Sequence, residues 1–256
     1  MPQSIKYGWK PELPDFRDHP YRLSRVALPQ KIDLRPSCPP VVDQSNLGSC
    51  VSNAVANAHL FNQLKQKKAS TSITTFFPSR LFIYYNARLI EGTVPYDAGA
   101  YVRDGIKVVG KFGACPELQW PYNISQFTNK PTNPCYSTAL EHTAISYQRL
   151  NSSLLNSMKS CLADGFPFVF GFTVYKSFES NKVETTGVVP MPARTEQVLG
   201  GHCVMCVGYD EKTQRFICMN SWGNKWGDKG YFYMPYPYLT NLNLADDFWT
   251  IRLVKT

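Results

Sequence analysis

Hydrophobic residues repeat at helical spacing in the first half of the chain and form short continuous runs in the second half. The clearest helical repeat follows Cys50, where apolar residues form one stripe and polar residues fall between them. This pattern predicts an amphipathic helix, with one buried face, that ends in the cations of Lys65–Lys68. The same spacing predicts further helices over 78–88, 101–109 and 152–164.

The second half of the chain contains more short apolar runs, each about as long as a single β-strand. A Pro- and Asn-rich stretch over 121–137 predicts a loop between the two halves. A helical half followed by a strand half indicates an α+β protein with two lobes. We predict the strands over 166–174, 203–209, 215–220, 230–234 and 248–254.

These patterns divide the chain into three parts. Residues 1–27 are rich in proline and charge and have no periodicity, so we predict an extended N-terminal segment. It is either a structural strap or tail, or a short prosegment that covers an active site. Residues 28–147 are predicted to form a mainly helical lobe, and residues 148–256 a mainly β lobe.

Cys50 is placed where a cysteine can become a nucleophile. The thiolate is the reactive form, and a helix N-terminus and a nearby imidazolium both lower the pKa of a cysteine. Cys50 stands at the start of the first predicted helix, six residues after Gln44. The helix start alone leaves a second interpretation open, in which Cys50 is only a small buried residue.

A candidate base, and a group to orient it, lie far along the chain. His202 opens one apolar run, and Asn220 ends the next, with a short turn at 210–214 between them. The two runs predict a hairpin that places His202 and Asn220 near each other. A thiol nucleophile needs a base, and the base needs a third group to hold its tautomer.

Together these segments resemble the papain family of cysteine peptidases. Gln44 and Cys50 match the oxyanion-hole glutamine and the nucleophile of that family, and His202 matches its general base. The similarity runs from about residue 28 to the C-terminus, and it is tightest to the cathepsin-like, short-prosegment branch of bacteria and large viruses. The most specific family motif is matched by Asn220-Ser221-Trp222-Gly223.

The resemblance implies a papain-like two-lobed fold, with a helical left lobe, a β-barrel-like right lobe and the active site in the cleft between them. It implies a cysteine endopeptidase that works through a Cys50–His202 thiolate–imidazolium pair and an acyl-enzyme. It places Gln44 in the oxyanion hole, and it implies that residues 1–27 would inhibit the enzyme, as a zymogen, if they cover the cleft. Substrate binding is assigned to Gly99, Gly201 and Trp222.

The chain departs from papain beside the nucleophile. Leu47 stands where papain has a disulfide-forming cysteine, and Val51 stands where papain has Trp. At least one usual disulfide of the helical lobe therefore cannot form. By loose similarity, Asp246 and Asp247 lie near the floor of the pocket for the P2 side chain, which would then tolerate Arg or Lys.

Cysteine content and charge narrow the chemistry further. Removing one nucleophile from the 8 cysteines leaves an odd number, which fits a partly or wholly reduced protein better than a complete disulfide framework. Cys203, Cys206 and Cys218 lie in strand-like runs without a tight loop, so we expect no metal. The net charge is +8, and no stripe of aromatic residues is interleaved with the basic residues. The positive charge is therefore best explained as a solvated surface.

We therefore expect polypeptide substrates, no cofactor, no nucleic-acid partner, no membrane partner and a monomeric protein. The sequence has no run of about eighteen apolar residues and no apolar segment near Met1 of the kind found in secretory signals. The cysteine pattern fits a soluble intracellular or virion-packaged protein.

Two other functions remain open from the sequence. A transglutaminase-like thiol acyltransferase uses a similar nucleophile, but such enzymes typically have Asp where this chain has Asn220. A catalytically silent scaffold of the same fold is the second alternative, and the presence of all four predicted site residues argues against it.

Overall fold

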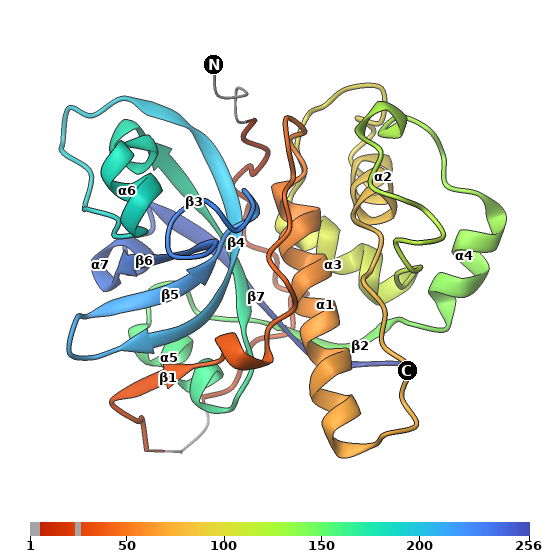
Figure 1. Ribbon diagram of the computed structural model, residues 1–256, viewed down its shortest axis with the longest axis horizontal. Helices are drawn as coiled ribbons and strands as arrows, with labels where there is room; N and C mark the ends of the chain where they lie inside the picture. The colour runs from red at the N-terminus through yellow and green to blue at the C-terminus, as the bar shows by residue number, and fades with distance from the viewer. Residues whose placement is uncertain (1–5, 24–26) are drawn as a thin grey trace.

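A long helix, α1 (Cys50–Ala69), organises one lobe of the molecule, and an antiparallel sheet organises the other. The computed structural model describes residues 6–23 and 27–256. Figure 1 shows the lobes side by side, with α1 at their boundary, where it packs against three strands of the sheet. The helical lobe also contains α2 (Arg80–Ile90), α3 (Val102–Lys111), the short η2 (Ile124–Gln126) and α4 (Asn133–Leu140).

The sheet has the order β2-β7-β3-β4-β5-β6 in the described residues, and every pairing is antiparallel. A short strand, β1 (Lys31–Asp33), pairs with β4 outside this path and precedes η1 (Arg35–Ser37). The path strands are β2 (Ala144–Arg149), β3 (Phe168–Tyr175), β4 (Val198–Asp210), β5 (Arg215–Met219), β6 (Tyr231–Pro235) and β7 (Ala245–Val254). The same lobe contains α5 (Leu155–Ala163), η3 (Lys176–Glu179), α6 (Asn181–Thr186) and α7 (Tyr236–Thr240).

Two hydrophobic cores hold the fold together. One lies where the helices pack on the sheet, and the other lies inside the β lobe and is rich in phenylalanine. Phe170 and Phe248 stack with ring centroids 5.3 Å apart in the second core. Because β4 contributes Met205 to the first core and Val204 to the second, this strand is fixed from both faces, which gives the residues at its start a rigid support.

The predicted α+β class is confirmed, and some local predictions are wrong. The stretch 121–137, predicted as a loop, contains η2 and most of the first two turns of α4. The division into a mainly helical lobe over 28–147 and a mainly β lobe over 148–256 stays a prediction; the first range contains β1 and most of β2 beside its helices. α2 begins after Pro78, because the Ser79 side chain accepts the Phe82 N–H and caps the helix.

The amphipathic character predicted for α1 is also wrong. Its first fourteen residues are all buried, polar ones included. Several of the polar side chains form internal hydrogen bonds: the Asn53 amide donates to the Ser49 carbonyl at 2.9 Å, and the Asn62 amide donates to the Ile251 carbonyl at 2.9 Å. A helix that is surrounded by protein can carry such residues when most of their polar groups find partners; among the described residues, the side-chain oxygen of Asn57 has none.

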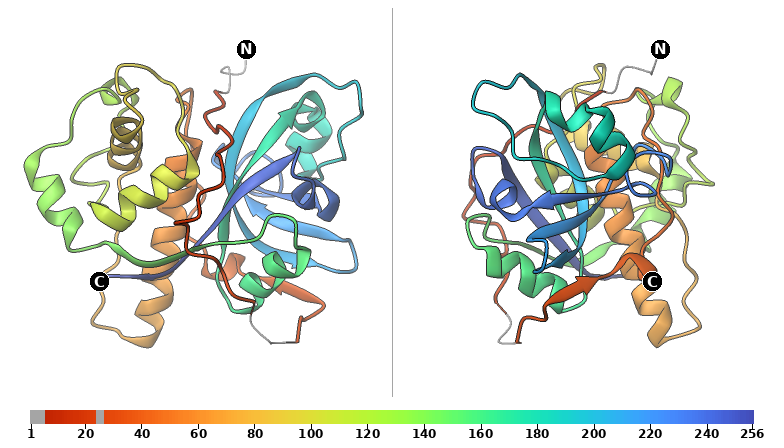
Figure 2. Two further views of the ribbon diagram at one scale, coloured as in Figure 1. Left: turned by 180° about the vertical axis from the view of Figure 1, so that it is seen from behind. Right: turned by 60° about the vertical axis from the view of Figure 1, so that its left-hand side comes forward.

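The N-terminal segment, residues 6–23, passes between the two lobes, and we call it the strap (Figure 2). It pairs with both of them. The Ala100 N–H donates to the Gly8 carbonyl at 2.8 Å, and the Trp9 N–H donates to the Gly201 carbonyl at 2.9 Å. Residues 1–5 and 24–26 of the predicted N-terminal segment lie outside the described residues.

Candidate active site

Cys50 opens α1, and its thiol is fully buried. Burial raises the pKa of this thiol to about 11, while the backbone amides of Cys203, Gly8, Val51 and Cys50 itself act in the opposite direction. Two of these amides belong to the start of the helix, where unpaired N–H groups favour a negative charge. Gly8 belongs to the strap, so the strap reaches the sulfur of the candidate nucleophile.

His202 lies near the start of β4, and its ring is held between two groups that follow β5. Its Nε2 donates to Oδ1 of Asn220 at 2.8 Å, as the predicted hairpin requires. The Trp222 ring stacks on the imidazole, with centroids 4.9 Å apart and planes inclined by 27°. Within the described residues, Nδ1 of His202 has no hydrogen-bond partner, so this nitrogen is the one available to a thiol.

The buried state of His202 determines its charge. Burial lowers the pKa of this imidazole to about 4, and the hydrogen bond with Asn220 opposes that shift. Together with the raised pKa of Cys50, this favours a neutral thiol and a neutral imidazole in the present arrangement.

Gln44 lies in the loop before α1. Both the nitrogen and the oxygen of its side-chain amide form hydrogen bonds. Its Nε2 donates to the Lys6 carbonyl at 3.2 Å and to the Leu47 carbonyl at 3.0 Å, and its Oε1 accepts from the Ser221 hydroxyl at 2.6 Å. Ser221 lies between the two residues that hold the His202 ring, so Gln44 is tied to the loop after β5. The amide thus faces a peptide carbonyl, which the strap supplies.

The residues predicted to bind substrate lie beside the strap. Gly99 has a φ of +71°, and a Cβ there would lie 2.0 Å from the Gly8 carbonyl oxygen. A Cβ at Gly201 would lie 2.4 Å from the Trp9 carbonyl oxygen, so both positions need glycine for the close approach of a peptide. Trp222 contacts the Tyr7 ring edge-on, with centroids 6.3 Å apart.

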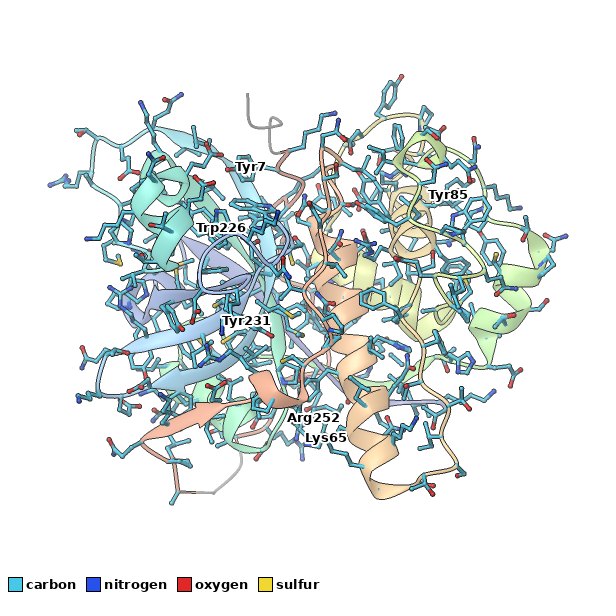
Figure 3. All side chains as sticks on the ribbon, viewed as in Figure 1. Tyr7, Lys65, Tyr85, Trp226, Tyr231 and Arg252 are labelled. Carbon is cyan, nitrogen blue, oxygen red and sulfur yellow. The ribbon has the colours of Figure 1, made fainter. Side chains whose placement is uncertain are left out.

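Trp9 is the main apolar contact of the strap. It is only 9% exposed. Its indole packs over Gly171, where a Cβ would lie 2.0 Å from the ring, and its Nε1 donates to Oδ2 of Asp247 at 2.9 Å. Asp247, which similarity places near a substrate pocket, thus lies directly under a strap side chain. Figure 3 shows Tyr7 at the same end of the molecule as Trp226, far from Lys65 and Arg252.

Buried and partly buried charges hold the strap beyond Trp9. Arg103 of α3 pairs with Glu12 at 3.0 Å and with Asp18 at 2.8 Å. Arg149 of β2 pairs with Asp18 at 2.8 Å and with Asp247 at 3.2 Å. We call these five residues the anchor network. In it, three carboxyl groups face two guanidinium groups, so one carboxyl group can keep its proton without leaving an arginine unpaired.

Comparison with known proteins identifies the family. Residues 28–247 match the sequence profile described as papain family cysteine protease. The chain belongs to the papain family of cysteine proteases. This protease is 44% identical over 236 residues to an uncharacterized peptidase C1-like protein of Acanthamoeba polyphaga mimivirus, which covers 90% of this chain and 72% of the relative.

Solved structures agree with the sequence match. The protease is 42% identical to xylellain, a cysteine protease from Xylella fastidiosa, with a TM-score of 0.90 over 99% of this chain and 98% of that chain. A procathepsin B from Trypanosoma congolense, at 18% identity, shares the fold with a TM-score of 0.76 over 98% of this chain and 87% of that chain. The predictions of the family, of the papain-like α+β fold and of a cysteine-type peptidase, a hydrolase, are confirmed.

The surroundings of His59 and of the cysteines indicate which other sites the described part of the protease can and cannot form. His59 is buried in α1, with its Nε2 2.9 Å from the His142 carbonyl oxygen. All eight cysteines, each within the described residues, are free thiols. No three or more His, Cys, Asp or Glu side chains in residues 6–23 and 27–256 are grouped so that they could hold a metal ion. None of the helices in that part of the chain is both long and apolar enough to cross a membrane.

The motifs did not predict the residues that hold the strap. Trp9, Glu12 and Asp18 are aromatic or acidic residues in a proline-rich segment without periodicity, and Arg103 and Arg149 look like ordinary surface cations in the sequence. One feature of the sequence indicates that this segment makes contacts with the rest of the protein: aromatic and charged residues accumulate in a segment that is too short to form a core of its own.

Proposed function

We propose that the protease is an endopeptidase that acts through a Cys50 thiolate and a His202 imidazolium. The observation that carries this proposal is the His202 ring, with Nε2 fixed by Asn220 at 2.8 Å and Nδ1 unpartnered among the described residues. The next residue along the chain, Cys203, directs its backbone amide at the Cys50 sulfur. Thiol and imidazole are therefore on segments that already touch.

The chemical steps follow from this arrangement. The Cys50 thiol gives its proton to His202 Nδ1, and the thiolate attacks the substrate carbonyl carbon to form a tetrahedral oxyanion. Collapse of the oxyanion breaks the C–N bond, His202 returns the proton to the leaving amine, and a thioester remains on Cys50. Water then attacks the thioester with His202 as base, which releases the acid and restores the thiol.

We assign the Gln44 amide and the Cys50 N–H as donors to the oxyanion. Support comes from the strap, because Gln44 Nε2 already donates to a peptide carbonyl, that of Lys6, at 3.2 Å. Preorganised donors of this kind stabilise a developing oxyanion by roughly 3 kcal/mol each. The strap passes right through between the lobes (Figure 2), which favours an endopeptidase, since a polypeptide can extend on both sides of the site.

We also propose that the strap inhibits the enzyme. It buries both Cys50 and His202, which favours the neutral pair over the reactive ion pair. It directs an amide N–H of Gly8 at the sulfur, and a hydrogen bond from an amide N–H to the sulfur leads to no cleavage at that peptide group. Its release would admit water to both groups and favour the charged pair.

Labelling of the full chain by an epoxysuccinyl thiol-protease inhibitor tests the proposed nucleophile. We expect a single adduct, located at Cys50 by mass spectrometry, and a loss of fluorogenic peptide turnover in proportion to it. The partly exposed Cys38 is the internal control for general thiol reactivity. An adduct at Cys38 with Cys50 unmodified, or labelling without loss of turnover, would contradict the proposal.

The strap is expected to open as the pH rises from about 5 to about 8. Burial, and then the nearby Asp247, raise the pKa of Glu12 to about 8, while burial, and then Asp246, raise the pKa of Asp247 to about 7. A raised carboxyl pKa means that closure takes up a proton, so the closed state is favoured at low pH and loses stability as the pH rises, by up to about tenfold per pH unit per proton. The readout is the rate at which iodoacetamide modifies Cys50.

Thiol ionisation also speeds this reaction as the pH rises, so a matched variant is needed. Glu12→Gln keeps the shape of a protonated Glu12 but cannot ionise, and at pH 8 it should label more slowly than the wild type, while the two agree at pH 5. Faster labelling of the wild type at pH 5 than at pH 8 would show that the sign is wrong.

A further inference from the structure

Tyr122 links the two ends of the turn that precedes the nucleophile. Its hydroxyl donates to the backbone carbonyl of Gln44 at 2.8 Å, and the same oxygen lies 2.5 Å from the Ser49 hydroxyl oxygen. Burial raises the pKa of Tyr122, so the phenol keeps its single proton. Because that proton is donated to Gln44, the Ser49 hydroxyl is the donor in the second hydrogen bond. One side chain is thus bonded to the residue of the proposed amide donor and to the residue just before Cys50.

Arg80 opens α2, which packs beside α1 (Figure 1), and its mostly buried side chain supports Tyr122. Its guanidinium carbon lies 3.7 Å from the centroid of the Tyr122 ring. One guanidinium nitrogen donates to the Asp43 carbonyl at 2.9 Å and to Oδ1 of Asn53 at 3.0 Å. Two other nitrogens donate to the carboxylate of Glu117, both at 2.8 Å. The Tyr122 ring therefore rests on a cation whose own position is set by a bidentate ion pair.

Gln44 is bonded to both lobes, and Tyr122 ties it to the lobe that carries Cys50. The Gln44 N–H donates to the Ser221 carbonyl at 2.8 Å, and its Oε1 accepts from the Ser221 hydroxyl at 2.6 Å. Both of these bonds come from the loop after β5, in the β lobe. The Tyr122 bond comes from the helical lobe, where α1 begins. The separation between the Gln44 amide and the Cys50 N–H therefore depends on both sets of contacts.

We propose that Tyr122 is a positioning residue that sets the separation of the two oxyanion donors, the Gln44 amide and the Cys50 N–H. This inference rests on the endopeptidase function proposed above and adds a residue that acts through Gln44 and Ser49. The bond to Ser49 restrains the residue whose peptide group carries the Cys50 N–H, and the bond to Gln44 restrains the backbone from which the amide extends. Donors stabilise an oxyanion when they are already aimed at it, so Tyr122 should act on the rate of the chemical step.

The expected effect of Tyr122→Phe is a loss in kcat with little change in KM. Loss of a whole oxyanion donor lowers kcat by about 10²- to 10³-fold, and this substitution displaces the donors without removing either. We therefore expect kcat to fall by about 10-fold. The Phe ring keeps its place on Arg80, so only the hydroxyl is lost. KM should change by less than about twofold, because the donors act on the transition state rather than on the bound substrate.

The experiment compares two reactions of Cys50 in the full chain. One is kcat/KM on a fluorogenic peptide, and the other is the second-order rate of alkylation by iodoacetamide. In the alkylation the thiolate attacks a tetrahedral carbon and displaces iodide, so no oxyanion forms. The fraction of enzyme with an open strap multiplies both rates and cancels from their ratio. We expect Tyr122→Phe to lower the ratio of peptide turnover to alkylation by about 10-fold.

The matched control is Tyr136→Phe. Tyr136 is another partly buried tyrosine of the helical lobe, and its hydroxyl donates at 3.0 Å to Oδ1 of Asn86, a residue of α2 rather than of the nucleophile turn. This variant should keep the wild-type ratio. Ser49→Ala is a second test, because it removes the other hydrogen bond of Tyr122 and leaves the bond to Gln44 in place. It should lower the ratio in the same direction as Tyr122→Phe.

The outcomes separate this inference from the proposed function. Unfolding temperatures identify the variants that fold. A wild-type ratio in folded Tyr122→Phe, or in folded Ser49→Ala, would overturn the inference and leave the endopeptidase proposal standing. Equal losses in peptide turnover and in alkylation would also overturn it, because they indicate a general loosening of α1. If the wild type neither cleaves the peptide nor becomes labelled at Cys50, the proposed function and this inference both fail.

Discussion

Cys50→Ala is expected to lower kcat/KM on a fluorogenic peptide by at least about 10⁴-fold, since loss of the nucleophile in a comparable hydrolase removes roughly 10⁶-fold. No other thiol can replace it, because the next cysteine toward the site, Cys203, is buried in β4 and presents its backbone amide to Cys50. The effect is measured in a chain that also carries Trp9→Ala, so that closure by the strap does not hide it.

Asn220→Ala provides the comparison within the same site. Asn220 orients His202 through a 2.8 Å hydrogen bond and makes or breaks no bond itself, so its loss should lower kcat at least about tenfold less than Cys50→Ala does. Unfolding temperatures of both variants serve as the control for stability. Equal inactivation by the two substitutions in folded protein would contradict the division into a nucleophile and an orienting residue.

The candidate site could be predicted from the sequence because its chemistry restricts the residue types. A thiol at a helix start, a histidine opening one strand and an asparagine ending the next can be recognised without knowing the fold. The hairpin between β4 and β5 then brings His202 and Asn220 together through local pairing. Only Cys50 depends on a long-range contact, and the family resemblance supplied that.

The environment of the site could not be predicted, because it depends on contacts between distant segments. Trp9 and Asp247 are separated by 238 positions in the chain, yet they form one hydrogen bond. The strap has no periodicity because its residues alternate between contacts with two lobes rather than with one core. Likewise, the polar residues of α1 look solvated in the sequence, and only the structure supplies the buried carbonyl that Asn62 meets.

Trp9→Ala is expected to raise the turnover of the full chain by at least about 100-fold, because truncating a buried Trp costs roughly 3–5 kcal/mol and here that cost falls on strap closure. The substitution removes the indole from Gly171 and the donor from Asp247. Asp247 then keeps only its remaining partners in the anchor network, which weakens the closed state further. Turnover and the rate of Cys50 labelling should rise together, until opening no longer limits either of them.

The strap itself offers the matched control. Phe16 is an aromatic residue of the same segment, but it is 98% exposed, so Phe16→Ala removes a similar side chain without removing a contact and should leave the turnover unchanged. If Trp9→Ala and Phe16→Ala both behave as the wild type does, the strap does not limit access to Cys50. If Trp9→Ala labels faster and still fails to cleave peptides, the strap covers the thiol, but its removal does not produce the charged Cys50–His202 pair. The combined outcome therefore separates steric cover from the effect of burial on the two pKa values.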